Sequence, residues 1–434
     1  MPKHGGNARI ARWLCAGLVA ALPIGAAVVL HKPDSPHALG RFHDDSAVPV
    51  IAAADQSSAA DQAVRLQALL GQHAALAADL MRSRIRGDDD FVQAANAALG
   101  QNTSDMTALV GRLFGAPTGE KFKPLWSQHI VELFAYAGAL ADHDDTAKAS
   151  ALDELTEYEG DLASFFAGSS QGRLPVSTAR SLVALHIQHL TGQADAYAAG
   201  NYPKADDLYG QGFEHTYDLG LLLAQALLPP SQTAVLTQPV WRLRSQLGRL
   251  LAEHAVLIED TTRAAVTGTP DFTASGGMLN ANTSDIAEAI DTLFGPAAAR
   301  QFQKLWGRHV EALVGYSAAI AAHDPAKQQK AKDQLATFEG SMSQFLAGAT
   351  GGRSTPAALE AALNDHDQML LQHADAYGTK NYTSAHDIAY QTYDHMFELA
   401  RTLADAFGAS VAARLPAGGA QTGYGGMARR VEQH

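Results

Sequence analysis

The chain has little cysteine and a shortage of basic residues, and each lack excludes a class of site. Its single cysteine, Cys15, lies in the N-terminal apolar segment, so the folded part has no disulfide and no thiolate metal site. Basic residues number 32 against 45 acidic ones, and the formal net charge is -13. We expect no nucleic-acid partner, because no basic surface is available to replace phosphate counterions. A bound metal would need His, carboxylate, Met or Tyr ligands.

Proline is scarce inside the long segments, while alanine and leucine are abundant and hydrophobic residues make up 47% of the chain. This composition predicts an all-α fold with hydrophobic cores. A length of 434 residues predicts two or three domains. Gly-rich phosphate loops and H-E-x-x-H motifs are absent from the sequence, so neither pattern indicates an enzyme.

Residues 1–30 have the pattern of an export signal. Lys3, Arg9 and Arg12 precede an almost unbroken apolar run at 13–30, which has roughly the minimum length for spanning a bilayer. The pattern fits a cleaved signal peptide and an uncleaved signal anchor about equally well. In both cases we expect the folded part to be exported and either membrane-anchored through this segment or secreted.

One stretch of the sequence occurs twice. Residues 123–129 read Lys-Pro-Leu-Trp-Ser-Gln-His, and residues 303–309 read Gln-Lys-Leu-Trp-Gly-Arg-His, at an offset of 180 residues. Leu-Phe-Gly precedes both copies at the same offset. A fixed offset is typical of a duplicated module. The sequence therefore predicts two tandem homologous antiparallel helical bundles after an N-terminal apolar helix.

The predicted organisation follows from changes in composition along the chain. A flexible stalk at 31–60 precedes the first module at 61–228. A proline-containing linker at 229–239 leads to the second module at 240–408, and a Gly-rich tail at 409–434 is predicted to be disordered. In the first module, apolar periodicity and Gly or Pro breaks predict helices at 63–86, 91–99, 104–114, 118–142, 146–167, 176–199 and 203–227.

Two Asn-Thr-Ser-Asp stretches and two histidines are predicted to lie at helix ends. Asn102 and Asn282 each begin one of these stretches, which offers N-caps. His143 and His323 follow long helices, so we predict that they cap the C-terminal ends.

Four further pairs of histidines recur at offsets of 180 or 181 residues. In each module they fall on four different long helices, among apolar neighbours. An unpaired imidazole in such a core costs roughly 1–3 kcal/mol, and one bound metal would satisfy all four. The predicted metal ligands are His73, His129, His186 and His215 in the first module and His254, His309, His366 and His395 in the second.

Neutral imidazole is a ligand for copper, zinc, iron and nickel, and we place copper first among them. Acidic residues next to the last histidine of each set are predicted to accept from its second ring nitrogen. They are Glu214 and Asp218 in the first module and Asp394 and Glu398 in the second. A single core histidine is more often hydrogen-bonded to a carbonyl than bound to metal. Recurrence on four helices, in both modules, is what favours the metal interpretation.

At its Leu-Trp-x-x-His motifs the chain resembles a family of exported bacterial helical proteins, mostly from Gram-positive lineages. Matching stretches are Phe-Leu-Ala-Gly-Ala-Thr-Gly at 345–351, Gln-His-Ala-Asp-Ala-Tyr at 372–377 and His-Met-Phe at 395–397. The resemblance spans roughly residues 63–407. Such sequences often carry the label "copper amine oxidase", so the resemblance implies copper and an exported location.

The resemblance does not imply the chemistry of an amine oxidase. Copper amine oxidases are β-rich enzymes whose cofactor tyrosine lies in Asn-Tyr-Asp/Glu. Here Tyr202 is followed by Pro203 and Tyr382 by Thr383, in a helical context.

Three functions fit these patterns. The first is an envelope-associated protein that binds copper, with zinc or iron as alternatives, and handles or stores it at one histidine site per module. The second is a non-enzymatic structural or interaction module of the cell envelope, whose core histidines only form hydrogen bonds. The third is a haem or di-iron redox protein. The first predicts that the histidines of a module converge, and the second predicts that they do not.

Overall fold

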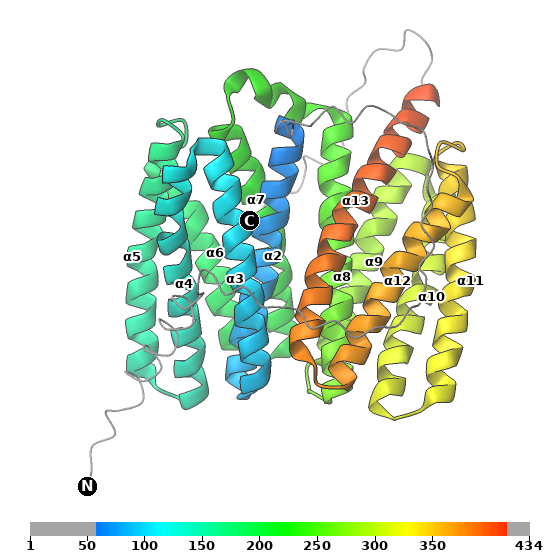
Figure 1. Ribbon diagram of the computed structural model, residues 1–434, viewed down its shortest axis with the longest axis horizontal. Coiled ribbons are helices and arrows are strands. Elements are labelled where there is room, and N and C mark those ends of the chain that lie inside the picture. Colours follow the sequence, from blue (N-terminus) through cyan, green and yellow to red (C-terminus); the bar gives the residue numbers. More distant parts are fainter. Residues whose placement is uncertain (1–57, 415–434) are drawn as a thin grey trace, which may run out of the picture.

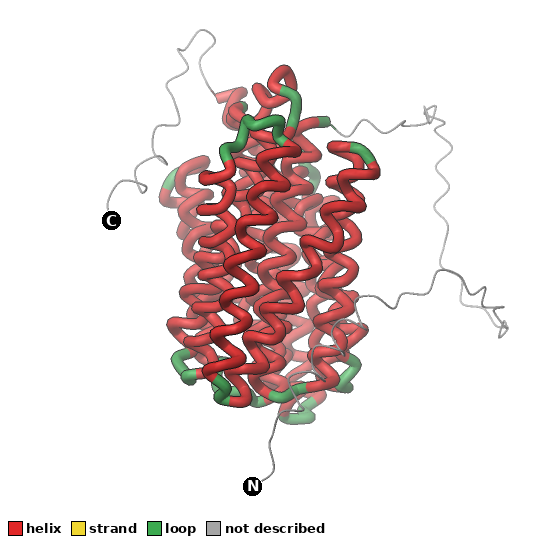
Figure 2. Tube along the Cα trace, turned by 90° about the vertical axis from the view of Figure 1, so that its left-hand side faces the viewer, coloured by secondary structure: helices red, strands yellow, loops and turns green. Residues whose placement is uncertain are grey.

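The computed structural model describes residues 58–414, and within this range every regular element is a helix (Figure 2). The all-α class predicted from the sequence is confirmed. The first half of the chain forms α2 (Ala59–Arg86), α3 (Asp89–Phe114), α4 (Ala116–Asp142), α5 (Asp145–Ser169), α6 (Val176–Ala198) and α7 (Tyr202–Leu227). The second half forms α8 (Pro239–Thr267), α9 (Phe272–Phe294), α10 (Pro296–Ala321), α11 (Pro325–Ala349), α12 (Pro356–Gly378) and α13 (Tyr382–Arg414).

The two halves, α2–α7 and α8–α13, stand side by side with their helices roughly along one common direction (Figure 1). The short 3-10 helix η1 (Pro230–Thr237) connects them, within the predicted linker. Each half fills its interior with one large apolar cluster. Each cluster also includes residues of the other half. Tyr377 of α12 packs in the cluster of the first half, and Tyr217 of α7 packs in the cluster of the second. The halves therefore share a packed interface.

Buried charges cross this interface. Arg82 of α2 lies 2.9 Å from Asp206 of α7 and 3.6 Å from Asp260 of α8. Arg263 of α8 contacts Asp260 at 2.7 Å and also Asp271. Both arginine side chains are only 3% exposed. Buried charges of this kind are tolerated only when they are paired, so this network fixes how the two halves meet.

The helix ends follow the local sequence. Asp144 accepts from the backbone N–H of Thr146 at 3.1 Å and so caps α5, and Asp324 caps α11 in the same way through Lys327 at 3.1 Å. His143 and His323 both adopt the left-handed conformation, with φ of 53° and 52°. Their backbone N–H groups donate to carbonyls of the last helical turn. The backbone of each histidine thus closes the helix end, whereas the prediction concerned the imidazole and the helix dipole.

One local prediction was wrong. The helices expected at 91–99 and 104–114 are one helix, α3, and Asn102 lies inside it rather than at its start. Asn102 is buried, and its amide donates to the Leu69 carbonyl and the Gln72 side chain of α2, both at 3.0 Å. Asn282 of α9 donates in the same way to the Leu250 carbonyl of α8. The neighbouring helix accepts the N–H groups of these amides, and this contact holds the two side chains inside α3 and α9 rather than at a helix end.

Several predicted segments lie outside the described residues. These are the signal or anchor at 1–30, all but the end of the stalk at 31–60, and the tail after residue 414. Helix α13 itself continues to Arg414, past the module boundary predicted at 408. None of the helices that the structure describes is long and apolar enough to cross a membrane.

Candidate metal centres

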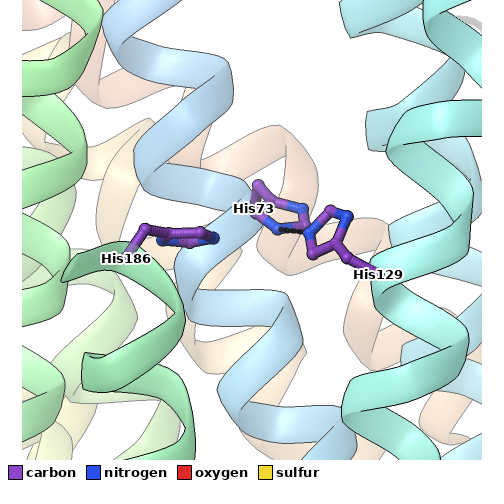
Figure 3. A group of neighbouring side chains, drawn as sticks. All are labelled: His73, His129 and His186. Carbon is purple, nitrogen blue, oxygen red and sulfur yellow. Dashed lines mark hydrogen bonds between the residues drawn. The ribbon is translucent and has the colours of Figure 1, made fainter. Parts of the chain in front are cut away.

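Three histidines from three helices of the first half converge in its core (Figure 3). His73 comes from α2, His129 from α4 and His186 from α6. On α4, Phe122, Trp126 and His129 are spaced by four and three residues, so they share the face that is turned inward. One ring nitrogen from each histidine lies within 4.8 Å of the others. The three helices thus place three imidazoles around one point.

The closest approach in this first triad is between His73 Nε2 and His129 Nε2, at 2.9 Å. The Trp126 ring lies 4.7 Å from the His73 ring and 4.8 Å from the His129 ring, between centroids. Tyr158 of α5 stacks on His129 at 4.7 Å, with the planes 17° apart. Aromatic rings therefore enclose the imidazoles and hold their orientation.

The imidazoles of the first triad are neutral. Burial lowers the pKa of His129 from 6.5 to about 3, because the charged form would lose its hydration. The pKa values of His73 and His186 fall well below the usual range, first through burial and then through repulsion from neighbouring histidines. Neutral imidazole is the form that binds metal ions, so these groups can act as ligands without first losing a proton.

The hydrogen bonds assign the tautomers. His129 Nδ1 contacts the carbonyl oxygen of Trp126, which can only accept, so Nδ1 carries the proton. The lone pair of His129 is then on Nε2, where the His73 Nε2–H donates to it. His73 Nδ1 and both ring nitrogens of His186 have no hydrogen-bond partner although they are buried. An unsatisfied buried polar group costs roughly 1–3 kcal/mol, so the free nitrogens favour a ligand in this core.

A second triad of the same kind occupies the second half. It consists of His254 on α8, His309 on α10 and His366 on α12, again with one nitrogen from each within 4.8 Å of the others. His254 Nε2 and His309 Nε2 are 3.2 Å apart, and the Trp306 ring lies 4.7 Å from the His254 ring. Both ring nitrogens of His366 are buried without a hydrogen-bond partner.

Burial makes the second triad neutral as well. It lowers the pKa of His309 from 6.5 to about 3, and the negative charge of Glu339 opposes this shift in part. It also lowers the pKa values of His254 and His366 well below the usual range. The two triads therefore offer the same ligand atoms in the same protonation state.

The surroundings of the two triads differ at one position. Asp367 of α12 is fully buried, and its Oδ1 lies 3.2 Å from His309 Nδ1. The residue 180 positions earlier is Ile187, which cannot accept a proton or carry a charge. Phe338 stacks on His309 at 4.5 Å, whereas Tyr158 stacks on His129. A carboxyl group thus lies against a candidate ligand of the second triad, and the corresponding position of the first triad carries an isoleucine.

The fourth predicted ligand of each set stands apart from its triad. His215 Nε2 donates to the carbonyl oxygen of Leu182 at 2.9 Å, and His395 Nε2 faces the carbonyl oxygen of Ala362 at 3.3 Å. Neither belongs to a group of converging ligand atoms. The structure therefore brings together three of the four predicted histidines in each half. The fourth has the hydrogen bond to a carbonyl that a structural core histidine makes.

The four predicted supporting acids also lie elsewhere. Asp394 pairs with Arg65 at 2.8 Å and Glu398 with Arg401 at 2.6 Å, both with exposed carboxylates. Glu214 is exposed 3.8 Å from Arg249. Burial and the charge of Glu214 raise the pKa of Asp218. Glu214, Asp394 and Glu398 thus form surface ion pairs, and none of the four acids belongs to a group of converging ligand atoms.

Sequence reasoning missed the two groups that face the central histidines, Tyr158 and Asp367. Both lie at positions where the two copies differ, Tyr158 against Phe338 and Asp367 against Ile187. Recurrence at a fixed offset therefore marks neither of them. A sequence signal did exist for Asp367, because it directly follows the predicted ligand His366.

Comparison with protein-family models, with curated proteins and with solved structures finds no match to this chain.

Proposed function

We propose that this protein binds two transition-metal ions, one at each histidine triad, and serves in the handling or storage of metal outside the cytoplasm. Copper is the first candidate, because it binds imidazole sites most strongly among the divalent first-row metals. Zinc is the second, since three histidines are a familiar zinc ligand set.

One observation carries this proposal. Three neutral, buried imidazoles meet in each half, and His186 and His366 each present two nitrogens without a hydrogen-bond partner. A core histidine that served only packing would be expected to find a carbonyl, as His215 does. Two such groups in one chain favour metal over chance.

The location and the origin of the two halves are part of the proposal. Export is supported by the basic and apolar segment at 1–30, with either membrane anchoring or secretion. A gene duplication is supported by the 180-residue offset and by equivalent contacts. Tyr136 donates to Asp195 at 2.8 Å, and Tyr316 donates to Asp375 at the same distance.

Metal analysis of the purified protein tests the proposal. We expect about two bound ions per chain after incubation with copper or zinc and desalting, and a raised melting temperature. His129→Gln and His309→Gln should each remove one ion. His386→Gln is the matched control, because His386 is also buried but contacts the carbonyl oxygen of Tyr382 instead of a triad. Absence of bound metal together with an unchanged melting temperature would contradict the proposal.

A structural role without metal is the second candidate, and one contact favours it. The Nε2 atoms of His73 and His129 are 2.9 Å apart, which is a hydrogen bond between neutral imidazoles that needs no ion. In that case the protein would be a non-enzymatic module of the cell envelope. The unmodified protein and His73→Leu would then both contain no metal, and the substitution would change only the stability of the fold.

A further inference from the structure

We propose that the two triads select ions of different charge: the first holds monovalent Cu(I), and the second holds a divalent ion such as zinc. This inference rests on the proposed function and goes beyond it. The observation behind it is the carboxyl group of Asp367, which lies 3.2 Å from His309 Nδ1 and has Ile187 as its counterpart in the first half.

Charge compensation is the physical reason. The free-energy cost of moving an ion from water into a protein core grows with the square of its charge, so a divalent ion needs a negative partner more than a monovalent ion does. The first triad presents three neutral imidazoles, enclosed by Trp126 and Tyr158. Cu(I) is a filled-shell ion that accepts two or three nitrogen ligands and brings one charge only. It suits a triad whose converging ligand atoms include no carboxylate oxygen.

Asp367 changes this balance in the second triad. A metal bound at His309 Nε2 requires the proton of this ring to be on Nδ1, where it faces Asp367 Oδ1. With a divalent ion bound, this carboxyl group gives up its proton, and the resulting carboxylate offsets part of the charge of the ion and increases the electron density that the imidazole donates. Glu339, which is 6% exposed, adds a second acidic group whose charge acts on His309. Both effects favour a divalent ion.

The His129 ring in the first triad has a weaker partner. Its Nδ1–H donates to the carbonyl oxygen of Trp126, which is a neutral acceptor. The acid that corresponds in sequence to Glu339 is Glu159, and its carboxylate lies 4.0 Å from Arg180. The buried Glu132 is on α4 one turn after His129, but its carboxylate lies outside the group of converging ligand atoms. It therefore needs a control of its own.

The test uses the full chain with one site removed at a time. His309→Gln with His366→Gln leaves only the first triad, and His129→Gln with His186→Gln leaves only the second. Affinities for Cu(I), under reducing conditions, and for Zn²⁺ are measured by competition with colorimetric chelators, and circular dichroism verifies that each protein is folded. We expect the ratio of Cu(I) to Zn²⁺ affinity to be at least about tenfold higher at the first site than at the second.

Asp367→Asn, made in the protein that keeps only the second triad, isolates the charge. Asparagine retains the shape of the side chain and an acceptor oxygen. If Asp367 had a purely structural role, the substitution would change the affinities for Zn²⁺ and Cu(I) equally. We expect Zn²⁺ affinity to fall about 10–100-fold and Cu(I) affinity to stay within about threefold. Equal losses for both ions would overturn the inference. So would Glu132→Gln, in the protein that keeps only the first triad, if it weakened Zn²⁺ binding tenfold.

The unmodified protein provides a measurement that does not depend on variants. Titration with Zn²⁺ alone should show one tightly bound ion per chain, and Cu(I) should then fill the remaining site without displacing it. Two zinc sites of equal affinity would overturn the inference that the triads select ions of different charge, but the proposed function would stand. If the protein binds neither ion, the proposed function fails as well, so the two failures are distinguishable.

Discussion

The two triads have the same three ligands and the same tryptophan, but they differ in what faces the central histidine. His129 donates to a backbone carbonyl, and a tyrosine stacks on it. His309 faces a buried carboxyl group, and a phenylalanine stacks on it. The identity of the three histidines alone therefore does not distinguish the two triads. The groups behind the ligands set the charge that the site can accept.

The largest effect on stability is expected at the interface between the two halves. Arg263 contacts two carboxylates, Asp260 and Asp271, and Arg82 contacts Asp206 closely and Asp260 more distantly. Removing either arginine takes the nearest positive charge away from a buried carboxylate, Asp206 for Arg82 and Asp260 and Asp271 for Arg263. We expect Arg263→Ala and Arg82→Ala to lower the free energy of unfolding by about 3–5 kcal/mol, with Arg263→Ala the more severe. Urea denaturation measures this.

Arg84→Ala is the control for that series, because Arg84 pairs at 3.5 Å with the exposed Asp142. A pair of this kind contributes at most about 1 kcal/mol. A loss below about 1 kcal/mol for Arg263→Ala would show that the interface network is not needed for stability.

Metal binding should stabilise the two halves separately. A ligand at about 100 times its dissociation constant raises the free energy of unfolding by about 2.7 kcal/mol per site. We expect His129→Gln to abolish the part gained with Cu(I) and His309→Gln the part gained with Zn²⁺. Thermal melting with each ion alone measures this. Loss of both gains from either single variant would show that the sites are not independent.

Acid should destabilise the metal-free protein through both triads. The pKa of His129 and of His309 is about 3 in the fold and 6.5 when exposed, so below pH 6.5 the unfolded chain takes up protons that the folded chain does not. Stability is then fully present above pH 6.5 and falls towards pH 3, by about 2 kcal/mol per histidine at pH 5.

Asp367 has the opposite effect on the dependence of stability on pH. Because it is present only in the second half, it should make the two halves respond differently to acid. Burial raises its pKa well above the usual value, so the folded chain holds a proton that the unfolded chain releases. Acidification therefore offsets part of the loss in the second half. We expect Asp367→Asn to make stability fall more steeply between pH 7 and pH 4, measured by urea denaturation across that range. An unchanged slope would argue against a protonated Asp367 in the metal-free fold.

The smallest effect is expected at the fourth histidine of each set. His215 donates to a carbonyl at 2.9 Å, whereas the corresponding contact of His395 is longer, at 3.3 Å. We expect His215→Ala and His395→Ala to cost about 1 kcal/mol each, with the larger loss for His215, and to leave metal content unchanged. Loss of a metal ion from either variant would place the fourth histidine in the site after all.

The fold class was accessible from the sequence, because apolar periodicity and punctuation by Gly and Pro act over a few residues. The caps that Asp144 and Asp324 form are local contacts as well, although they were not predicted. The error at Asn102 arose where a long-range contact overrode a local signal. Its amide bonds to α2, 33 and 30 residues earlier in the chain, and no local rule contains that contact.

The sequence by itself determined which histidines are candidates, since recurrence at a fixed offset marks His73, His129 and His186 together with their partners in the second half. It also determined that these residues lie on separate helices. Only the tertiary structure decided that three of each four converge, because the crossing of α2, α4 and α6 sets the direction of each imidazole. Only the structure placed Asp367 against His309, since that contact joins α10 and α12 through space.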